Sequence, residues 1–203
     1  MRRQCLRLVA ADASEYLTEL SDDEVMGHVA ADSRNAFGVL VRRYQPLVCG
    51  MASRFLGDVS GGRDVAQDVF LTVWLDRRKY IPQGAFERYL ATLCIHRCHV
   101  VSRQHRRSMK RDDRWRLTVG KRRHDSGELP FRQLLSEERR KWAQAALTRL
   151  SDDMRWVVIL RFFNELSLNE IVETTGLPMG TVKSHLVRGV RYLCRFIDQE
   201  VLR

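Results

Sequence analysis

The sequence predicts an all-α protein built from two small helical domains joined by a flexible linker. Apolar residues recur with helical spacing over residues 21–107 and again over 137–203, and neither stretch holds a convincing run of alternating strand residues. Between them this periodicity is lost, and Arg, Lys, Asp and Gly are mixed with Pro130, as is typical of a linker. A chain of 203 residues is long enough for two such domains. We set the boundaries at 1–20 for an N-terminal extension, 21–107 for the first domain, 108–135 for the linker and 136–203 for the second domain.

Helix-capping and helix-breaking residues support this organisation. Ser21-Asp-Asp-Glu24 predicts a capping box at the start of the first domain. Pro46, the stretch 57–62 and Pro82-Gln-Gly84 then divide that domain into about four helices. In the second domain Ser151 and Ser167 are expected to begin helices, and another should begin near 180–181.

Composition excludes several classes of protein. An apolar fraction of 44% supports packed cores, and no stretch approaches the roughly 20 apolar residues of a membrane-spanning helix. Arg7 and Asp12 interrupt the only short apolar start, so we expect no secretory signal and place the protein in the cytoplasm. Five cysteines form no regular framework, and we expect them to stay reduced.

The net charge of +10 predicts a polyanionic partner. Residues 103–123 hold ten Lys or Arg against two Asp, so most of the excess lies in one segment. The simpler alternative, a solvated linker, fits residues 110–123 equally well.

A helix-turn-helix is expected from Leu166 to Leu186, because Gly176 ends one amphipathic helix and Pro178 precedes another. A helical wheel places the packing face of the second helix at Met179, Val182, Leu186, Gly189, Val190 and Leu193. No acidic residue lies between Met179 and Arg195, so this helix can enter a major groove. The expected base-reading residues are Thr181, Lys183, Ser184 and His185, and the expected phosphate contacts are Arg188, Arg191 and Arg195. The alternative is an ordinary surface helix with a basic outer face.

The helix expected over residues 63–77 has two faces of different character. Its core half contains Val65, Ala66, Val69, Phe70, Val73 and Trp74. Its opposite half contains Asp64, Gln67, Asp68, Leu71, Thr72 and Leu75, and a solitary domain would gain little by exposing two leucines there. This half is expected to dock a partner, unless an N-terminal helix covers the leucines.

The segment Asp64-Val-Ala-Gln-Asp-Val-Phe-Leu-Thr-Val-Trp74 resembles the Asp-x-x-Gln-Asp/Glu-x-Phe-x-x-x-Trp signature of extracytoplasmic-function (ECF) sigma factors. Ala36-Phe-Gly-Val-Leu-Val-Arg-Arg-Tyr-Gln-Pro46 is similar to the opening helix of that family. Leu150-Ser-Asp-Asp-Met-Arg-Trp-Val-Val-Ile-Leu-Arg-Phe-Phe163 is similar to the helix leading into its region four. The likeness extends from residue 21 to about 199 in the order of the family.

The resemblance implies a sigma factor that directs promoter-specific transcription initiation and makes or breaks no bond itself. Region two (21–107) would bind core RNA polymerase and the minus-ten element, region four (136–203) would read the minus-thirty-five element, and an anti-sigma factor is a further expected partner. The implied polymerase contacts are Asp64, Gln67, Asp68, Leu71 and Leu75. Arg103, Arg106 and Arg107 would hold single-stranded DNA. No cofactor or metal is implied, and no stable membrane insertion is expected.

The family captures an unpaired base at the loop that corresponds to residues 81–85, and Tyr80, Phe86 and Tyr89 could stack there. For Phe86 and Tyr89, anchoring the last helix of the domain in the core is the favoured alternative.

Some positions depart from the family pattern. His96 and Val100 replace the usual Asn and Asp of the last region-two helix, and His185 replaces a frequent Arg. Gly189 replaces a usual Ala and should weaken its helix by about 0.5–1 kcal/mol. Cys94, His96, Cys98 and His99 cannot all face one ion on an intact helix, so we expect structural cysteines and no metal site.

Two other functions stay open from the sequence. A stand-alone helix-turn-helix regulator would need the DNA reader but no docking face. A sigma mimic that sequesters an anti-sigma factor would need the docking faces but no basic reader. An enzyme is not expected, because the sequence has no phosphate loop, nucleophile motif or two-histidine metal spacing backed by a carboxylate.

Overall fold

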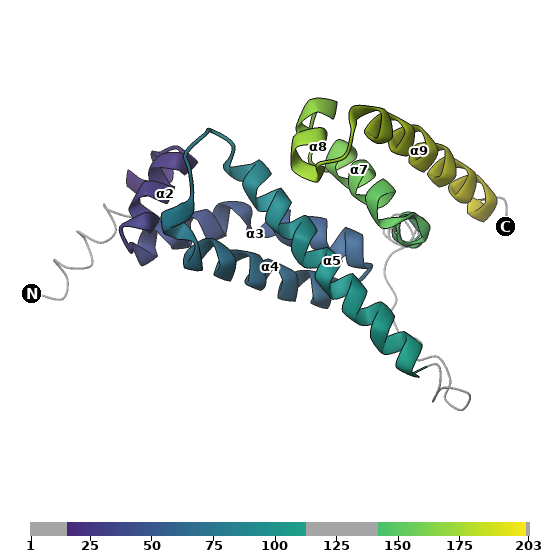
Figure 1. Ribbon diagram of the computed structural model, residues 1–203, viewed down its shortest axis with the longest axis horizontal. Helices are drawn as coiled ribbons and strands as arrows, with labels where there is room; N and C mark the ends of the chain where they lie inside the picture. Colours follow the sequence, from purple (N-terminus) through teal and green to yellow (C-terminus); the bar gives the residue numbers. More distant parts are fainter. Residues whose placement is uncertain (1–15, 113–141, 202–203) are drawn as a thin grey trace, which may run out of the picture.

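The computed structural model describes residues 16–112 and 142–201, with side chains described for 16–104 and 142–196 (Figure 1). The helices of the first module are α2 (Asp22–Ala30), α3 (Arg34–Leu56), α4 (Val59–Leu75), the short 3₁₀ helix η1 (Arg77–Lys79) and α5 (Phe86–Asp112). Those of the second module are a helical segment at 142–149, α7 (Asp152–Phe162), α8 (Leu168–Thr175) and α9 (Met179–Val201). Within these described ranges there is no strand, and the all-α prediction is confirmed.

Local chemistry sets the helix boundaries, largely as predicted. Ser21 and Glu24 form the expected capping box at α2, and Ser167 and Glu170 form a second one at α8. Gly176 ends α8 in the left-handed conformation with φ 70°, which glycine adopts without the steric cost of a Cβ. One boundary differs, because α5 continues to Asp112, beyond residue 107. Most of the predicted linker and residues 1–15 lie outside the described residues.

The first module packs α2, α4 and α5 against the long helix α3. The predicted core half of α4 is buried at Val65, Ala66, Val69, Phe70 and Val73, while Trp74 is partly buried and packs tilted against Phe37 with ring centroids 5.1 Å apart. Burial of this apolar stripe is the main stabilising contribution to such a helix.

The second module packs α9 across α7 and α8, as the helix-turn-helix pattern predicts. Val182 and Ile171 are fully buried between these helices. Gly189 lies where α9 crosses α7: a Cβ at this position would lie 2.8 Å from Cγ2 of Val158 and 3.2 Å from Cγ of Met154. Gly189 therefore allows a close approach of the two helices, which the sequence did not reveal.

Replacing Gly189 with alanine is expected to destabilise the protein by about 1 kcal/mol. Alanine gains up to about 1 kcal/mol of helix propensity, but overpacking a close contact costs about 1–3 kcal/mol. Gly180→Ala is a matched control in the same helix, because a Cβ there meets no atom within 4 Å. We expect urea denaturation midpoints to move in opposite directions, down for Gly189→Ala and up for Gly180→Ala; an increase for both would contradict the packing argument.

The two modules pack directly on each other, α7 against α3 and α8 against α5 (Figure 1). The rings of Phe55 and Trp156 stack with centroids 4.5 Å apart at 14°. Arg155 is 8% exposed and donates to the carbonyl oxygens of Phe55, Leu147, Thr148 and Leu150. The two helical domains are thus as predicted, but they share a continuous apolar core.

Candidate protein and nucleic-acid interfaces

The outward face of α4 exposes two leucines beside acidic and amide side chains. Leu71 is 55% exposed and Leu75 66% exposed. Asp64 and Gln67 are exposed on the same face. The described part of the chain, which includes α2, leaves both leucines uncovered, so the alternative of a face buried by an N-terminal helix does not hold for these residues.

Asp68 differs from the other residues of this predicted set. Its carboxylate accepts from Nε and Nη2 of Arg97, at 2.8 and 2.6 Å, and so ties α4 to α5. Both side chains are partly exposed, and such a pair contributes about 0–1 kcal/mol to stability. A partner could therefore compete for Asp68 at modest cost.

An apolar groove runs beside the leucines between α3 and α4. Its α4 side is formed by Ala66, Gln67, Phe70, Leu71 and Trp74, together with Arg63. Its α3 side, formed by Arg34, Phe37, Val41 and Gln45, was missed by the sequence analysis. The spacing of Phe37, Val41 and Gln45 at every fourth residue could have indicated one helical face, but a wheel drawn for a single helix does not show which neighbour lies beside it.

Aromatic rings surround the loop between η1 and α5. Phe86 is 2% exposed, which confirms its predicted core role. Tyr80 lies 5.7 Å from Phe86 and 5.3 Å from Tyr89 between ring centroids, and both tyrosines are half-buried. A cavity of about 530 Å³ opens between this loop and α5, lined by Tyr80, Ile81, Gln83, Tyr89 and further residues.

Helix α8 of the second module forms one wall of this cavity. Glu173 and Thr174 line it, and Glu173 pairs with Arg88 of α5. Arg88 was also missed by the sequence analysis.

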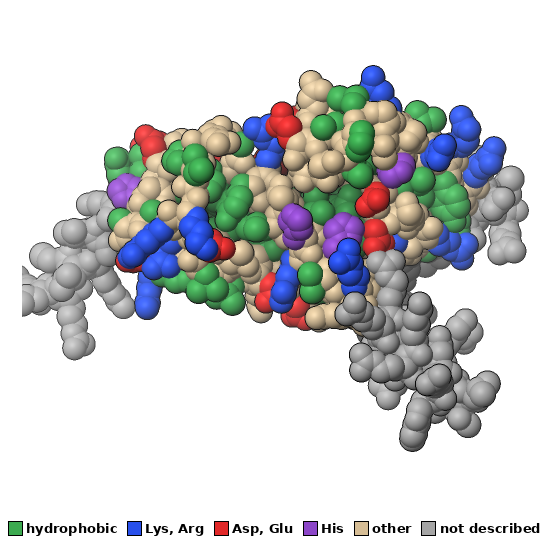
Figure 2. Space-filling model, viewed as in Figure 1, with side chains coloured by type: hydrophobic (Ala, Val, Ile, Leu, Met, Phe, Trp, Pro, Cys, Tyr) green, Lys and Arg blue, Asp and Glu red, His purple; other side chains and the backbone are tan. Residues whose placement is uncertain are grey.

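The predicted DNA-reading helix α9 lies along the outer edge of the molecule (Figure 1). Lys183, Arg188, Arg191 and Arg195 are exposed, and Figure 2 shows basic side chains gathered over this helix. Thr181 and Ser184 are half-exposed at its start, where Oγ of Ser184 donates to the carbonyl oxygen of Thr181. The structure thus brings the predicted DNA-contacting residues of α9 onto one accessible surface, with one exception.

The exception is His185, whose side chain is half-buried. Its Nδ1 is buried and has no hydrogen-bond partner among the described residues. Only part of the ring can therefore reach a base.

Basic residues at the end of α5 form the third predicted DNA surface. Arg103 is exposed, and the side chains of Arg106 and Arg107 lie outside the described residues. His96 and Val100, the two departures from the family pattern, are exposed on the same helix.

Cys94 and Cys98 behave as structural residues. Cys94 and Cys98 are fully buried on the α3 side of α5, whereas His96 points to solvent. A hydrogen bond with Cys98 and burial raise the pKa of Cys94 well above its ordinary value, which keeps it a thiol at neutral pH. No group of three His, Cys, Asp or Glu side chains in the described ranges could hold a metal ion.

His99 lies where α5 meets α3 and α7. Its ring packs edge-on against Phe55 at 5.7 Å, and its Nδ1 is 3.8 Å from Asp152. Burial lowers the pKa of His99 below its ordinary 6.5, against the opposing effect of Asp152 and Asp153, while Arg103 and His96 lower it further.

This pKa shift predicts a pH-dependent stability. Because the unfolded state binds the proton more tightly, the contribution of neutral His99 is present above pH 6.5 and is lost as the pH falls through the lowered pKa. We expect the free energy of unfolding to decrease between about pH 7.5 and 5.5, and His99→Gln to flatten this dependence. Urea titrations at several pH values provide the measurement. The exposed His96→Gln is the control, and an unchanged slope in His99→Gln would contradict the assignment.

Comparison with known proteins agrees with this geometry. Two family models match the chain, Sigma-70 region 2 over residues 40–108 and Sigma-70 region 4 over residues 140–193. RNA polymerase sigma-H factor of Pseudomonas aeruginosa is 28% identical over 177 residues, covering 85% of this chain and 91% of that one. ECF RNA polymerase sigma-E factor of Escherichia coli is 28% identical over 179 residues, covering 84% and 91%.

Two solved structures share the fold. CnrH, in complex with the cytosolic domain of CnrY, has a TM-score of 0.61 and 21% identity and covers 89% of this chain and 99% of that one. The sigma factor RpoE of Bartonella quintana, in complex with the anti-sigma factor NepR, has a TM-score of 0.62 and 19% identity and covers 80% and 96%.

The fold and its two modules define a sigma-70-type protein with regions two and four. More narrowly, the chain belongs to the extracytoplasmic-function subfamily of bacterial RNA polymerase sigma factors. In the parts of the chain that the structure covers, no helix is long and apolar enough to cross a membrane.

Proposed function

We propose that this sigma factor binds core RNA polymerase through the exposed face of α4 and the adjoining α3–α4 groove. The polymerase-contacting residues are Asp64, Gln67, Asp68, Leu71 and Leu75, and Phe37 and Val41 extend the surface on α3. The observation that carries the proposal is the pair of exposed leucines, because large apolar side chains beside an apolar groove are typical of a protein-binding surface.

Promoter DNA is bound by both modules in this proposal. Region four, residues 136–203, reads the minus-thirty-five element with the start of α9. Arg188, Arg191 and Arg195 contact the phosphates of the DNA backbone. Region two, residues 21–107, holds the melted minus-ten strand with Arg103, Arg106 and Arg107. An unpaired base enters the cavity beside Tyr80 and Tyr89, where stacking contributes about 1–3 kcal/mol per base. Residues 108–135 link the regions.

We infer a regulatory partner and a cellular site from the family resemblance. Both similar structures are complexes with a second protein, and in the RpoE structure that protein is the anti-sigma factor NepR. We assign an anti-sigma partner to this chain as well. Because its targets are polymerase and chromosomal DNA, it acts in the cytoplasm, and it performs no catalysis of its own.

Promoter-dependent transcription by core polymerase supplemented with the purified protein tests the proposal. Specific transcripts from a library of promoter fragments, together with co-elution of the protein with core, are the expected result. DNA binding without core binding would indicate a stand-alone regulator, and binding to an anti-sigma factor without either activity would indicate a sigma mimic; each would overturn the proposal.

Arg188→Ala distinguishes phosphate binding from base reading. If Arg188 contacts a phosphate, holoenzyme affinity should fall similarly on all promoters, and the slope of log K against log salt should decrease in magnitude by about one unit. Filter binding at several salt concentrations measures both quantities. A loss confined to one promoter sequence would instead make Arg188 a base reader.

A further inference from the structure

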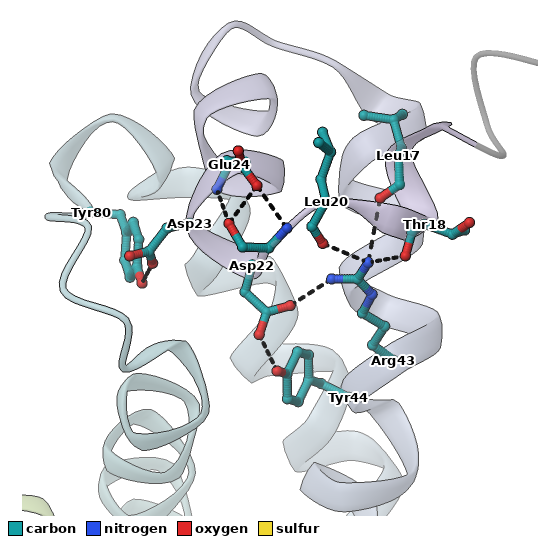
Figure 3. Close-up of polar contacts among 10 residues, drawn as sticks. Leu17, Thr18, Leu20, Asp22, Asp23, Glu24, Arg43, Tyr44 and Tyr80 are labelled. Atoms are coloured by element: carbon teal, nitrogen blue, oxygen red, sulfur yellow. Dashed lines mark hydrogen bonds and ion pairs between the residues drawn. The ribbon is translucent and has the colours of Figure 1, made fainter.

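Asp23, in the first turn of α2, accepts hydrogen bonds from both ends of the loop at residues 80–84. One carboxylate oxygen accepts from the hydroxyl of Tyr80 at 2.5 Å, and the other accepts from the backbone N–H of Gly84 at 2.7 Å. Figure 3 shows Asp23 facing the Tyr80 ring across the gap between α2 and the loop. One side chain from a distant part of the sequence thus bridges the two ends of this loop.

The three residues between these anchors project outward. Ile81 is 69% exposed, Pro82 and Gln83 are also exposed, and Gly84 has φ 63°, which allows the sharp return into α5. Ile81 and Gln83 line the cavity beside α5. With so little packing of their own, their positions depend on where the loop ends are held.

Asp23 is itself held in place by a rigid neighbourhood. Asp22 accepts from Arg43 at 2.8 Å and from the hydroxyl of Tyr44, and Arg43 also donates to carbonyl oxygens that precede α2 (Figure 3). The capping box of Ser21 and Glu24 fixes the helix start. Burial and the hydrogen bond to Asp23 raise the pKa of Tyr80 well above its usual value, so its hydroxyl stays a donor at neutral pH.

We propose that Asp23 is a positioning residue for promoter specificity, which sets the shape of the base-binding cavity through Tyr80 and Gly84 and thereby determines how strongly one unpaired base is preferred over the others. The inference rests on the proposed function. A hydrogen-bonded, pre-shaped pocket discriminates between bases, whereas a loose loop accepts several. The competing role for Asp23 is simple anchoring of α2.

The test compares holoenzymes formed with the full-length chain and core polymerase. Wild type first selects promoters from a duplex library randomised upstream of the start site. On a selected promoter, each non-template base of the melted region is then replaced in turn, and abortive-initiation rates give the discrimination ratio at the most selective position. A 2-aminopurine placed at that position reports base capture by its fluorescence.

Asp23→Ala is expected to lower the discrimination ratio about threefold to tenfold, and Tyr80→Phe to lower it by a smaller factor. The double variant should lose less than the product of the two single losses, because both remove the same hydrogen bond. Asp23→Asn, whose amide oxygen can still accept one bond, should fall between wild type and Asp23→Ala. Core affinity should stay within about twofold of wild type in each variant.

Asp22→Ala provides the matched control, because it loosens α2 through Arg43 and Tyr44 without touching the loop. We expect it to lower the unfolding midpoint but to lower the discrimination ratio by less than Asp23→Ala does, because Asp23 keeps both of its hydrogen bonds to the loop. An equal loss of discrimination in Asp22→Ala, or an unchanged ratio in Asp23→Ala, would refute the positioning role while leaving the proposed function intact. Failure of the wild-type holoenzyme to select any promoter would overturn the proposed function and this inference with it.

Discussion

Replacing Leu71 with aspartate is expected to weaken binding to core RNA polymerase by about 100-fold. Fully burying a leucine side chain contributes about 1.5–3 kcal/mol, and a carboxylate in its place must be desolvated without a partner. Leu71 combines 55% exposure with a place at the α3–α4 groove, so the change should act on binding and leave folding nearly unaffected. Titration of labelled protein with core polymerase, followed by fluorescence anisotropy, gives the dissociation constant.

Val59→Asp is the matched control for this measurement. Val59 is 61% exposed at the opposite end of the same helix and does not line the groove. An acidic residue in the first turn of α4 is also compatible with the helix dipole. Equal losses of affinity in both variants would show a general charge effect, and an unchanged affinity in Leu71→Asp would place the polymerase contact elsewhere.

Arg155→Met should cause the largest loss of stability, about 3–5 kcal/mol. Its guanidinium donates to at least four carbonyl oxygens, at 2.6–3.0 Å, and methionine removes all of these donors, although the Leu147 oxygen still accepts from the backbone N–H of Leu150 at 3.1 Å. One acceptor is Phe55 of α3, so the contact between the modules should weaken along with the second module itself. The urea midpoint is expected to fall by about 1–3 M in a circular-dichroism titration.

Arg161→Met serves as the comparison for Arg155→Met. Arg161 lies on the same helix, is exposed and donates to one carbonyl oxygen, that of Leu166 at 2.9 Å. We expect a loss of about 1 kcal/mol or less. Similar losses in the two variants would mean that removal of an arginine side chain from α7, rather than satisfaction of buried carbonyls, accounts for the effect.

Local features explain why much of the fold could be predicted. Ser21 with Glu24 and Ser167 act within a single turn, and Gly176 ends α8 through its own backbone, so their effect does not depend on distant residues. Periodicity likewise identified the buried half of α4 and the outward-facing Leu71 and Leu75. The same reasoning did not reveal the close contact at Gly189, because that contact depends on Val158 of another helix.

The candidate site was predictable only one helix at a time. The α4 face and the basic outer face of α9 are properties of single helices, and both are exposed in the structure. Phe37 and Arg88 went unrecognised because their places in the groove and the cavity depend on neighbouring helices. The pairing of Asp68 with Arg97 was missed for the same reason.

The sequence by itself determined the two helical modules and the outward faces of α4 and α9, because helix caps and apolar periodicity act over a few residues, and the Asp64–Trp74 signature indicated the class of this protein. The tertiary structure decided how these parts meet. Tyr80 lies 57 residues from Asp23, and Phe55 lies 100 residues from Arg155. Contacts over such separations form only after the helices have packed, since shape and hydrogen-bond geometry select among many possible partners, and no local pattern encodes that selection.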